Sequence, residues 1–138
     1  MRFWKATAIV AFLVSISPAT AGPYLFELLE IRAYRAGWDA MLKVQKNLPA
    51  WVSAFSKTMD GVATPSEDVD IDGQAYLYAT VCKPHDCGGN TLYVVFNTEG
   101  MAWGLLAGSA DGDNHKDRYL GKPNNAIADA LAAKAKSD

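Results

Sequence analysis

The sequence is poor in the residues from which metal and thiol sites are built, with two cysteines and two histidines. Four residues separate Cys82 from Cys87, whereas thiol oxidoreductases usually place two residues between their cysteines. No third cysteine is present to complete a zinc site with His85, and an oxidised pair offers no thiolate ligand. We therefore predict no redox centre, no metal site and no cofactor.

The sequence also has no excess of positive charge. It contains 13 Lys and Arg against 15 Asp and Glu, and without Arg2 and Lys5 the balance becomes 11 against 15, a net charge of −4. No basic stripe is visible, which argues against nucleic acid as a partner. A negatively charged protein is attracted at long range to a basic one, so the balance is compatible with a basic protein partner.

Motifs for nucleophilic, phosphate and calcium chemistry are missing as well. Neither His85 nor His115 stands near a serine in a sharp, glycine-flanked turn, and the glycines form no phosphate loop. The segment from Asp111 to Asp117 resembles the start of a calcium loop, but Lys116 and Lys122 replace the required glycine and glutamate. We predict a solvated loop there, assign no role to His115, and expect that the protein is not an enzyme.

The first residues have the layout of a secretory signal peptide. A positive start precedes the apolar run Ala6–Ile16, and Ala19-Thr20-Ala21 is a small-x-small cleavage site. The apolar run is too short to span a bilayer, so we predict no membrane anchor. We expect residues 1–21 to be removed by cleavage near Ala21. Residues 22–138 then form one domain of about 117 residues, a usual size.

The two cysteines flank the polar segment Lys83-Pro84-His85-Asp86. Export would place them in an oxidising compartment, where so close a pair is expected to form a disulfide. The disulfide and the proline leave this loop few backbone states, so it would lose little entropy on binding. Exposed polar residues on a braced loop more often contact a partner than fill a core. The alternative is that the disulfide is only a structural staple at the tip of a hairpin and the loop binds no partner.

Apolar periodicity and turn signals predict the order helices, strands, helix. Helices are expected at Pro23–Lys46, Ala50–Phe55 and Ala126–Lys136, the last capped by Asn124 or Asn125. Strands are expected at Gln74–Val81, Thr91–Asn97 and Met101–Ala107, preceded by a short edge strand around Val69 and Ile71 that ends in a turn at Asp72-Gly73. The segment Gly108–Asn124 is expected to be a polar, turn-rich loop. These elements predict an α+β domain, an antiparallel meander flanked by helices, with the cysteine loop protruding from its first hairpin.

The loop Cys82-Lys83-Pro84-His85-Asp86-Cys87 resembles the protruding loop of the Ivy family, the bacterial inhibitors of vertebrate lysozyme. The similarity covers most of the chain after the leader, and the loop is its specific part. The supporting stretches are Pro23–Leu29 with Tyr34, Trp38 and Met41, then Leu48–Val52, Asp72-Gly73, Tyr76, Leu92–Phe96 and Trp103–Leu106.

The resemblance implies a periplasmic protein of Gram-negative bacteria, and a homodimer is implied because several members form dimers. In the family, the loop enters the active-site cleft of C-type lysozyme, and its histidine lies between the two catalytic carboxylates. Carried over to this chain, that histidine is His85, and Cys82 and Cys87 form the bracing disulfide. The implied lysozyme-binding residues are Lys83, Pro84, His85 and Asp86.

Two other functions stay open from the sequence. One is a regulator of the cell's own lytic transglycosylases, whose clefts are similar in kind to that of lysozyme. The other is a small periplasmic enzyme that works through His85 and the acidic residues. Inhibition assays on both enzyme types separate the first from lysozyme inhibition, and turnover lost in His85→Ala identifies the second.

Overall fold

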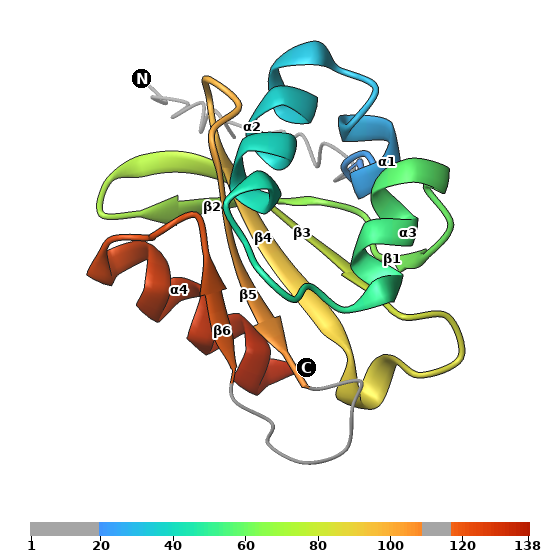
Figure 1. Cartoon of the computed structure of the whole chain (residues 1–138). Helices are drawn as coiled ribbons and strands as arrows, with labels where there is room; N and C mark the ends of the chain where they lie inside the picture. Colours follow the sequence, from blue (N-terminus) through green and yellow to red (C-terminus); the bar gives the residue numbers. More distant parts are fainter. Residues whose placement is uncertain (1–19, 109–116) are drawn as a thin grey trace, which may run out of the picture.

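The computed structural model describes residues 20–108 and 117–138, which form a six-stranded antiparallel sheet between two layers of helices (Figure 1). Most of the predicted leader and of the acidic segment 111–117, including His115, lies outside these residues. Within the described ranges, no helix combines the length and the apolar character that crossing a membrane requires. The α+β class and the flanked antiparallel sheet predicted from the sequence are confirmed.

The elements follow the predicted order. The helices are α1 (Leu25–Leu28), α2 (Arg32–Lys43), α3 (Ala50–Thr58) and α4 (Asn125–Ser137). The strands are β1 (Val62–Ala63), β2 (Glu67–Ile71), β3 (Gln74–Cys82), β4 (Thr91–Asn97), β5 (Ala102–Ala107) and β6 (Arg118–Leu120).

The first predicted helix, Pro23–Lys46, is wrong in one respect, because the chain turns between Leu28 and Arg32 and forms two helices. In α1 the Glu27 carboxylate accepts a hydrogen bond from the Tyr24 backbone N–H at 2.7 Å, which satisfies a free donor at the helix start. Leu25, Leu28 and Leu29 are all buried. These leucines share one helix face, which in a continuous helix would lie opposite the buried Trp38 and Met41 of α2. The turn lets both helices bury their apolar faces against the same core.

The strands are ordered β1-β3-β4-β5-β6, and β2 pairs with the start of β3 on the same edge as β1. The predicted turn at Asp72-Gly73 is confirmed, and both residues have positive φ, 52° and 77°. This is the two-residue hairpin turn that Asp-Gly favours. Strand β6, which pairs with β5 through Leu120 and Gly104, lies inside the segment predicted to be a loop.

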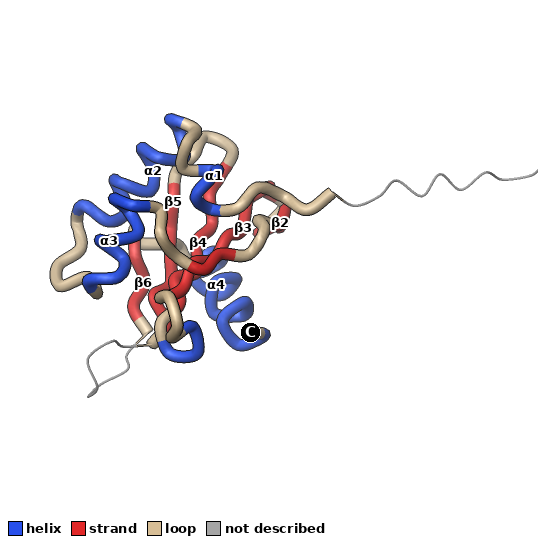
Figure 2. The backbone as a smooth tube through the Cα atoms, turned by 90° about the vertical axis from the view of Figure 1, so that its right-hand side faces the viewer, coloured by secondary structure: helices blue, strands red, loops and turns tan. Residues whose placement is uncertain are grey.

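Figure 2 shows α1, α2 and α3 on one side of the sheet and α4 on the other, and alternating side chains of the strands build a hydrophobic core on each face. On one face, Ala79, Val81, Leu92, Val94 and Phe96 pack with buried side chains of α1, α2 and α3. On the other face, Tyr76, Tyr78, Tyr93, Val95 and Leu105 pack with Ile127 and Leu131 of α4. The central strands β3 and β4 are therefore covered on both faces.

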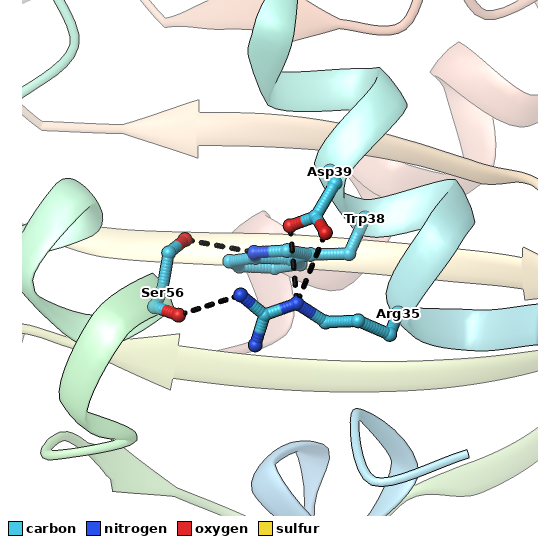
Figure 3. A network of polar contacts seen from close by, with 4 residues as sticks. All are labelled: Arg35, Trp38, Asp39 and Ser56. Atoms are coloured by element: carbon cyan, nitrogen blue, oxygen red, sulfur yellow. Dashed lines mark hydrogen bonds and ion pairs between the residues drawn. The ribbon is translucent and has the colours of Figure 1, made fainter. Parts of the chain in front are cut away.

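Contacts on two sides tie α2 to its neighbours. A Cβ at Gly37 would collide with the carbonyl oxygen of Gly100, so the glycine permits the close approach of α2 to the turn before β5. On the side of α3, Trp38 Nε1 donates to Ser56 Oγ at 2.8 Å (Figure 3). Arg35 Nη2 donates to the Ser56 carbonyl at 2.9 Å, and its Nε pairs with Asp39 at 3.1 Å. Trp38 itself is completely buried, as expected of a core residue.

Candidate functional site

The cysteine loop joins the two central strands of the sheet. Cys82 ends β3, and its register partner Thr91 begins β4. Cys82 and Cys87 form the predicted disulfide, with their Cα atoms 5.0 Å apart. The loop extends beyond the ends of β3 and β4 (Figure 1), so it is attached to the part of the sheet that is best covered.

The residues between the cysteines form a tight turn. The Asp86 backbone N–H donates to the Lys83 carbonyl at 3.1 Å, and Pro84 occupies the second position of the turn. His85 follows with φ 64°, in the left-handed region. A proline before a residue of positive φ is the pattern of a type II turn, which places glycine or asparagine at this third position most readily.

A histidine at positive φ is therefore the unusual feature of this turn. The left-handed conformation costs an L-residue about 1–2 kcal/mol, although histidine, asparagine and aspartate tolerate it better than most. Strained residues of this kind cluster at sites of function, where the surrounding structure holds them. In this loop the neighbouring disulfide and proline supply such constraints.

The His85 side chain is exposed to solvent, as is Asp86, whereas Lys83 and Pro84 are half-buried. Lys83 Nζ lies 3.8 Å from Asp86 Oδ2, so the residues on the two sides of Pro84-His85 in the sequence form an ion pair. The loop thus projects an imidazole into solvent and does not pack it against a core.

Two residues that no sequence motif marks support the loop, one directly before β4 and one at its start. Asn90 is buried, with 4% of its surface exposed, and its Nδ2 donates to Asp86 Oδ2 at 2.8 Å. Thr91 Oγ1 donates to the Cys87 carbonyl at 2.9 Å. Gly108, at φ 81°, lies so close to the Gly89 carbonyl that a side chain there would displace the base of the loop.

The strands behind the loop add no charge to this region. The rings of Tyr78 and Tyr93 stack with their centroids 6.5 Å apart on the α4 face. Burial raises the pKa of both phenols, and the negative charge of Asp138 raises it further. Both therefore stay neutral at ordinary pH, whereas Asp138 adds a negative charge on this side, because it lines the same surface hollow as Cys82, Cys87 and Tyr93.

The described residues offer no arrangement for metal chemistry, because nowhere in 20–108 or 117–138 do three His, Cys, Asp or Glu side chains gather closely enough to hold an ion. The site has instead the features of a recognition element. It has a rigid backbone, an exposed imidazole and two flanking charges.

The sequence is similar to a protein family and to several known proteins. The family model described as Inhibitor of vertebrate lysozyme (Ivy) matches residues 33–119, which include the loop. A Pseudomonas aeruginosa protein named Inhibitor of vertebrate lysozyme is 34% identical, covering 95% of this chain and 91% of its own length. An uncharacterized Yersinia pestis protein is 35% identical over 88% of this chain and 82% of its own. The Escherichia coli K12 protein named Inhibitor of vertebrate lysozyme is 32% identical, over 68% of this chain and 57% of its own. The chain therefore belongs to the Ivy family.

Proposed function

We propose that this protein inhibits C-type lysozyme by inserting the loop between Cys82 and Cys87 into the active-site cleft, with His85 as the principal contact. The observation that carries the proposal is the exposed imidazole on a loop closed by a disulfide, in a chain whose relatives are named as lysozyme inhibitors. Those names describe inhibitors, in accord with the prediction that this chain is not an enzyme.

The chemistry of lysozyme explains why an imidazole would inhibit it. Glycoside hydrolysis of this type needs one carboxylic acid that protonates the leaving oxygen and a second carboxylate that stabilises or attacks the sugar. A protonated imidazole has two N–H donors, one for each carboxylate. Such hydrogen bonds are charge-assisted, and the ring also occupies the position of the scissile bond.

The distribution of acids in the domain fits this orientation. The exposed acids Glu67, Asp68 and Asp70 of β2 pair with the start of β3, and the loop leaves from the other end of that strand. The excess negative charge of the domain can attract a basic enzyme at long range, and in the loop the positive Lys83 stands beside the acidic Asp86. Lys83 and Asp86 then lie where they can contact the walls of the cleft.

We also propose that the protein acts in the periplasm after cleavage near Ala21. The described chain supports a domain that begins close to this position. The Ser66 backbone N–H donates to the Pro23 carbonyl at 2.9 Å, and Tyr24 forms a bridge with Pro65. The fold therefore makes its first backbone contacts within three residues of the proposed cleavage point.

The experiment that tests the proposed function is a titration of lysozyme activity with the purified protein, residues 22–138. We expect stoichiometric loss of activity when the enzyme concentration exceeds the dissociation constant. The same titration with a lytic transglycosylase in place of lysozyme tests the alternative that the protein regulates the cell's own enzymes. Loss of transglycosylase activity would support that alternative. Lysozyme activity that is unchanged at a large molar excess would contradict the proposal.

Opening the ring should affect binding more than folding. In the chain-entropy model a ring of this size stabilises the fold by about 2 kcal/mol. We expect the double variant Cys82→Ser, Cys87→Ser to lose no more than that in the free energy of unfolding, measured in guanidinium. Its inhibition constant should rise about tenfold, because a loosened loop must be ordered again on binding. A much larger loss of stability with unchanged inhibition would instead favour the structural-staple alternative.

A further inference from the structure

Asn90 makes hydrogen bonds to three residues of the loop although it lies outside the disulfide ring. Its carbonyl accepts from the Lys83 N–H at 3.0 Å, and its own N–H donates to the Cys87 carbonyl at 3.3 Å. Its side-chain Nδ2 donates to Asp86 Oδ2 at 2.8 Å. Asn90, a buried residue directly before β4, thus contacts the beginning, the middle and the end of the loop.

The side-chain bond connects Asn90 to His85 through a single residue. The Asp86 carboxylate accepts a hydrogen bond from the Asn90 side-chain amide. The Asp86 backbone N–H donates to the Lys83 carbonyl at 3.1 Å, which closes the turn. That turn holds His85 at φ 64°. A residue in this conformation needs a surrounding structure that fixes it, and the hydrogen bond to a carboxylate is among the stronger ones in a protein.

We propose that Asn90 is a positioning residue for inhibition, which fixes Asp86 and through it the turn that presents His85. This inference rests on the proposed function and adds a non-covalent clasp, Asn90 with Asp86, to the disulfide. It also gives Asp86 a role within the loop besides any contact with the enzyme. Because both the clasp and the disulfide favour the same closed loop, each stabilises the other.

The first test is the kinetics of inhibition by Asn90→Ala, which keeps the two backbone hydrogen bonds and removes the side-chain one. A smaller fraction of competent loop lowers the association rate in proportion. We expect association to slow about tenfold while dissociation changes little, unlike the loss of a direct contact, which mainly speeds dissociation. An unchanged association rate would overturn the proposal.

The matched control is Asn124→Ala, which removes the side chain that caps α4 through its bond to the Ile127 N–H at 2.9 Å. This is the same substitution at another asparagine whose side chain makes one hydrogen bond, at the start of α4 and outside the loop (Figure 1). Association and dissociation rates of this variant should equal those of the parent. A slowing equal to that in Asn90→Ala would show a general effect of destabilisation and would also overturn the proposal.

The second test needs no lysozyme, so it separates failure of the clasp from failure of the proposed function. The equilibrium between the Cys82–Cys87 disulfide and dithiothreitol is measured by thiol labelling. In Asn90→Ala the closed loop, in which the two sulfurs are close enough to bond, is less populated. The equilibrium between the disulfide and dithiothreitol should therefore shift about tenfold toward the dithiol. Asn124→Ala should not shift it. An Asn90→Ala protein with the parent's equilibrium would contradict the clasp even if the parent inhibits lysozyme.

A double-mutant cycle identifies the partner of Asn90. Asp86→Ala should shift the dithiothreitol equilibrium at least as far as Asn90→Ala, because it also removes the carboxylate that pairs with Lys83. The two effects should not add in the double variant, because each substitution alone already breaks the one bond. Additive shifts would show that the residues act independently, which would overturn the pairing on which the inference depends.

Discussion

Replacing His85 with asparagine is expected to weaken lysozyme inhibition by a factor of about 100 or more, with no change in melting temperature. Two charge-assisted hydrogen bonds are lost, and bonds to charged groups contribute about 1.5–3 kcal/mol each. Asparagine is the informative substitution because it tolerates the positive φ of this position, 64°, as histidine does. The backbone of the turn is then preserved while the imidazole is removed.

Companion variants separate the side chain from the backbone at this position. His85→Gly removes the strain of the left-handed conformation, and His85→Ala retains it, so the two should differ in loop stability. If the imidazole is the principal contact, all three variants should lose inhibition to a similar extent. Lys83→Ala, at a half-buried neighbour, should lose much less. An asparagine variant that inhibits as strongly as the parent would remove His85 from the mechanism.

The largest loss of stability is expected for Trp38→Ala, at about 3–5 kcal/mol. The Trp38 side chain is completely buried between α3 and the sheet and stacks edge-on against Phe55, with ring centroids 5.7 Å apart. Truncation removes these contacts and leaves a cavity, and it also leaves Ser56 Oγ without its indole donor. Guanidinium unfolding at constant pH measures the change in the free energy of unfolding.

The control for this prediction is Trp38→Phe, which fills most of the space but cannot donate to Ser56 (Figure 3). We expect it to lose about 1–2 kcal/mol, the cost of the unmade hydrogen bond and a small void. Its inhibition should match that of the parent, because Trp38 lies in the core and not in the loop. Equal losses for alanine and phenylalanine would show that the hydrogen bond, and not the packing, dominates at this site.

The parts of the fold that could be predicted from the sequence are those that local patterns determine. The hairpin of β3 and β4 follows from runs of Tyr, Thr and Val, and the turn at Asp72-Gly73 from its residue types. Strand β6 has only three residues and depends on pairing with β5, so the local sequence pattern does not predict it. The turn between α1 and α2 likewise depends on which face each helix buries against the core, and a run of apolar residues near helical spacing does not specify that.

Some residues of the candidate site could likewise be predicted from the sequence and others could not. The cysteine pair and His85 are conspicuous in the sequence because cysteine and histidine are rare in it, and the disulfide was predicted from their proximity along the chain. The role of Asn90 depends on hydrogen bonds that close around a turn, and asparagine is common in loops for many reasons. The positive φ of His85 was equally hidden, since the usual sequence signal for such a position is glycine.

The four residues between Cys82 and Cys87 contribute no side chain to either hydrophobic core. If the loop selects the target, as we propose, folding and target choice depend on separate parts of the chain. Selection, or a designer, can exchange this short insert for another tetrapeptide while the underlying scaffold stays intact, provided that the new third residue of the turn accepts a left-handed backbone.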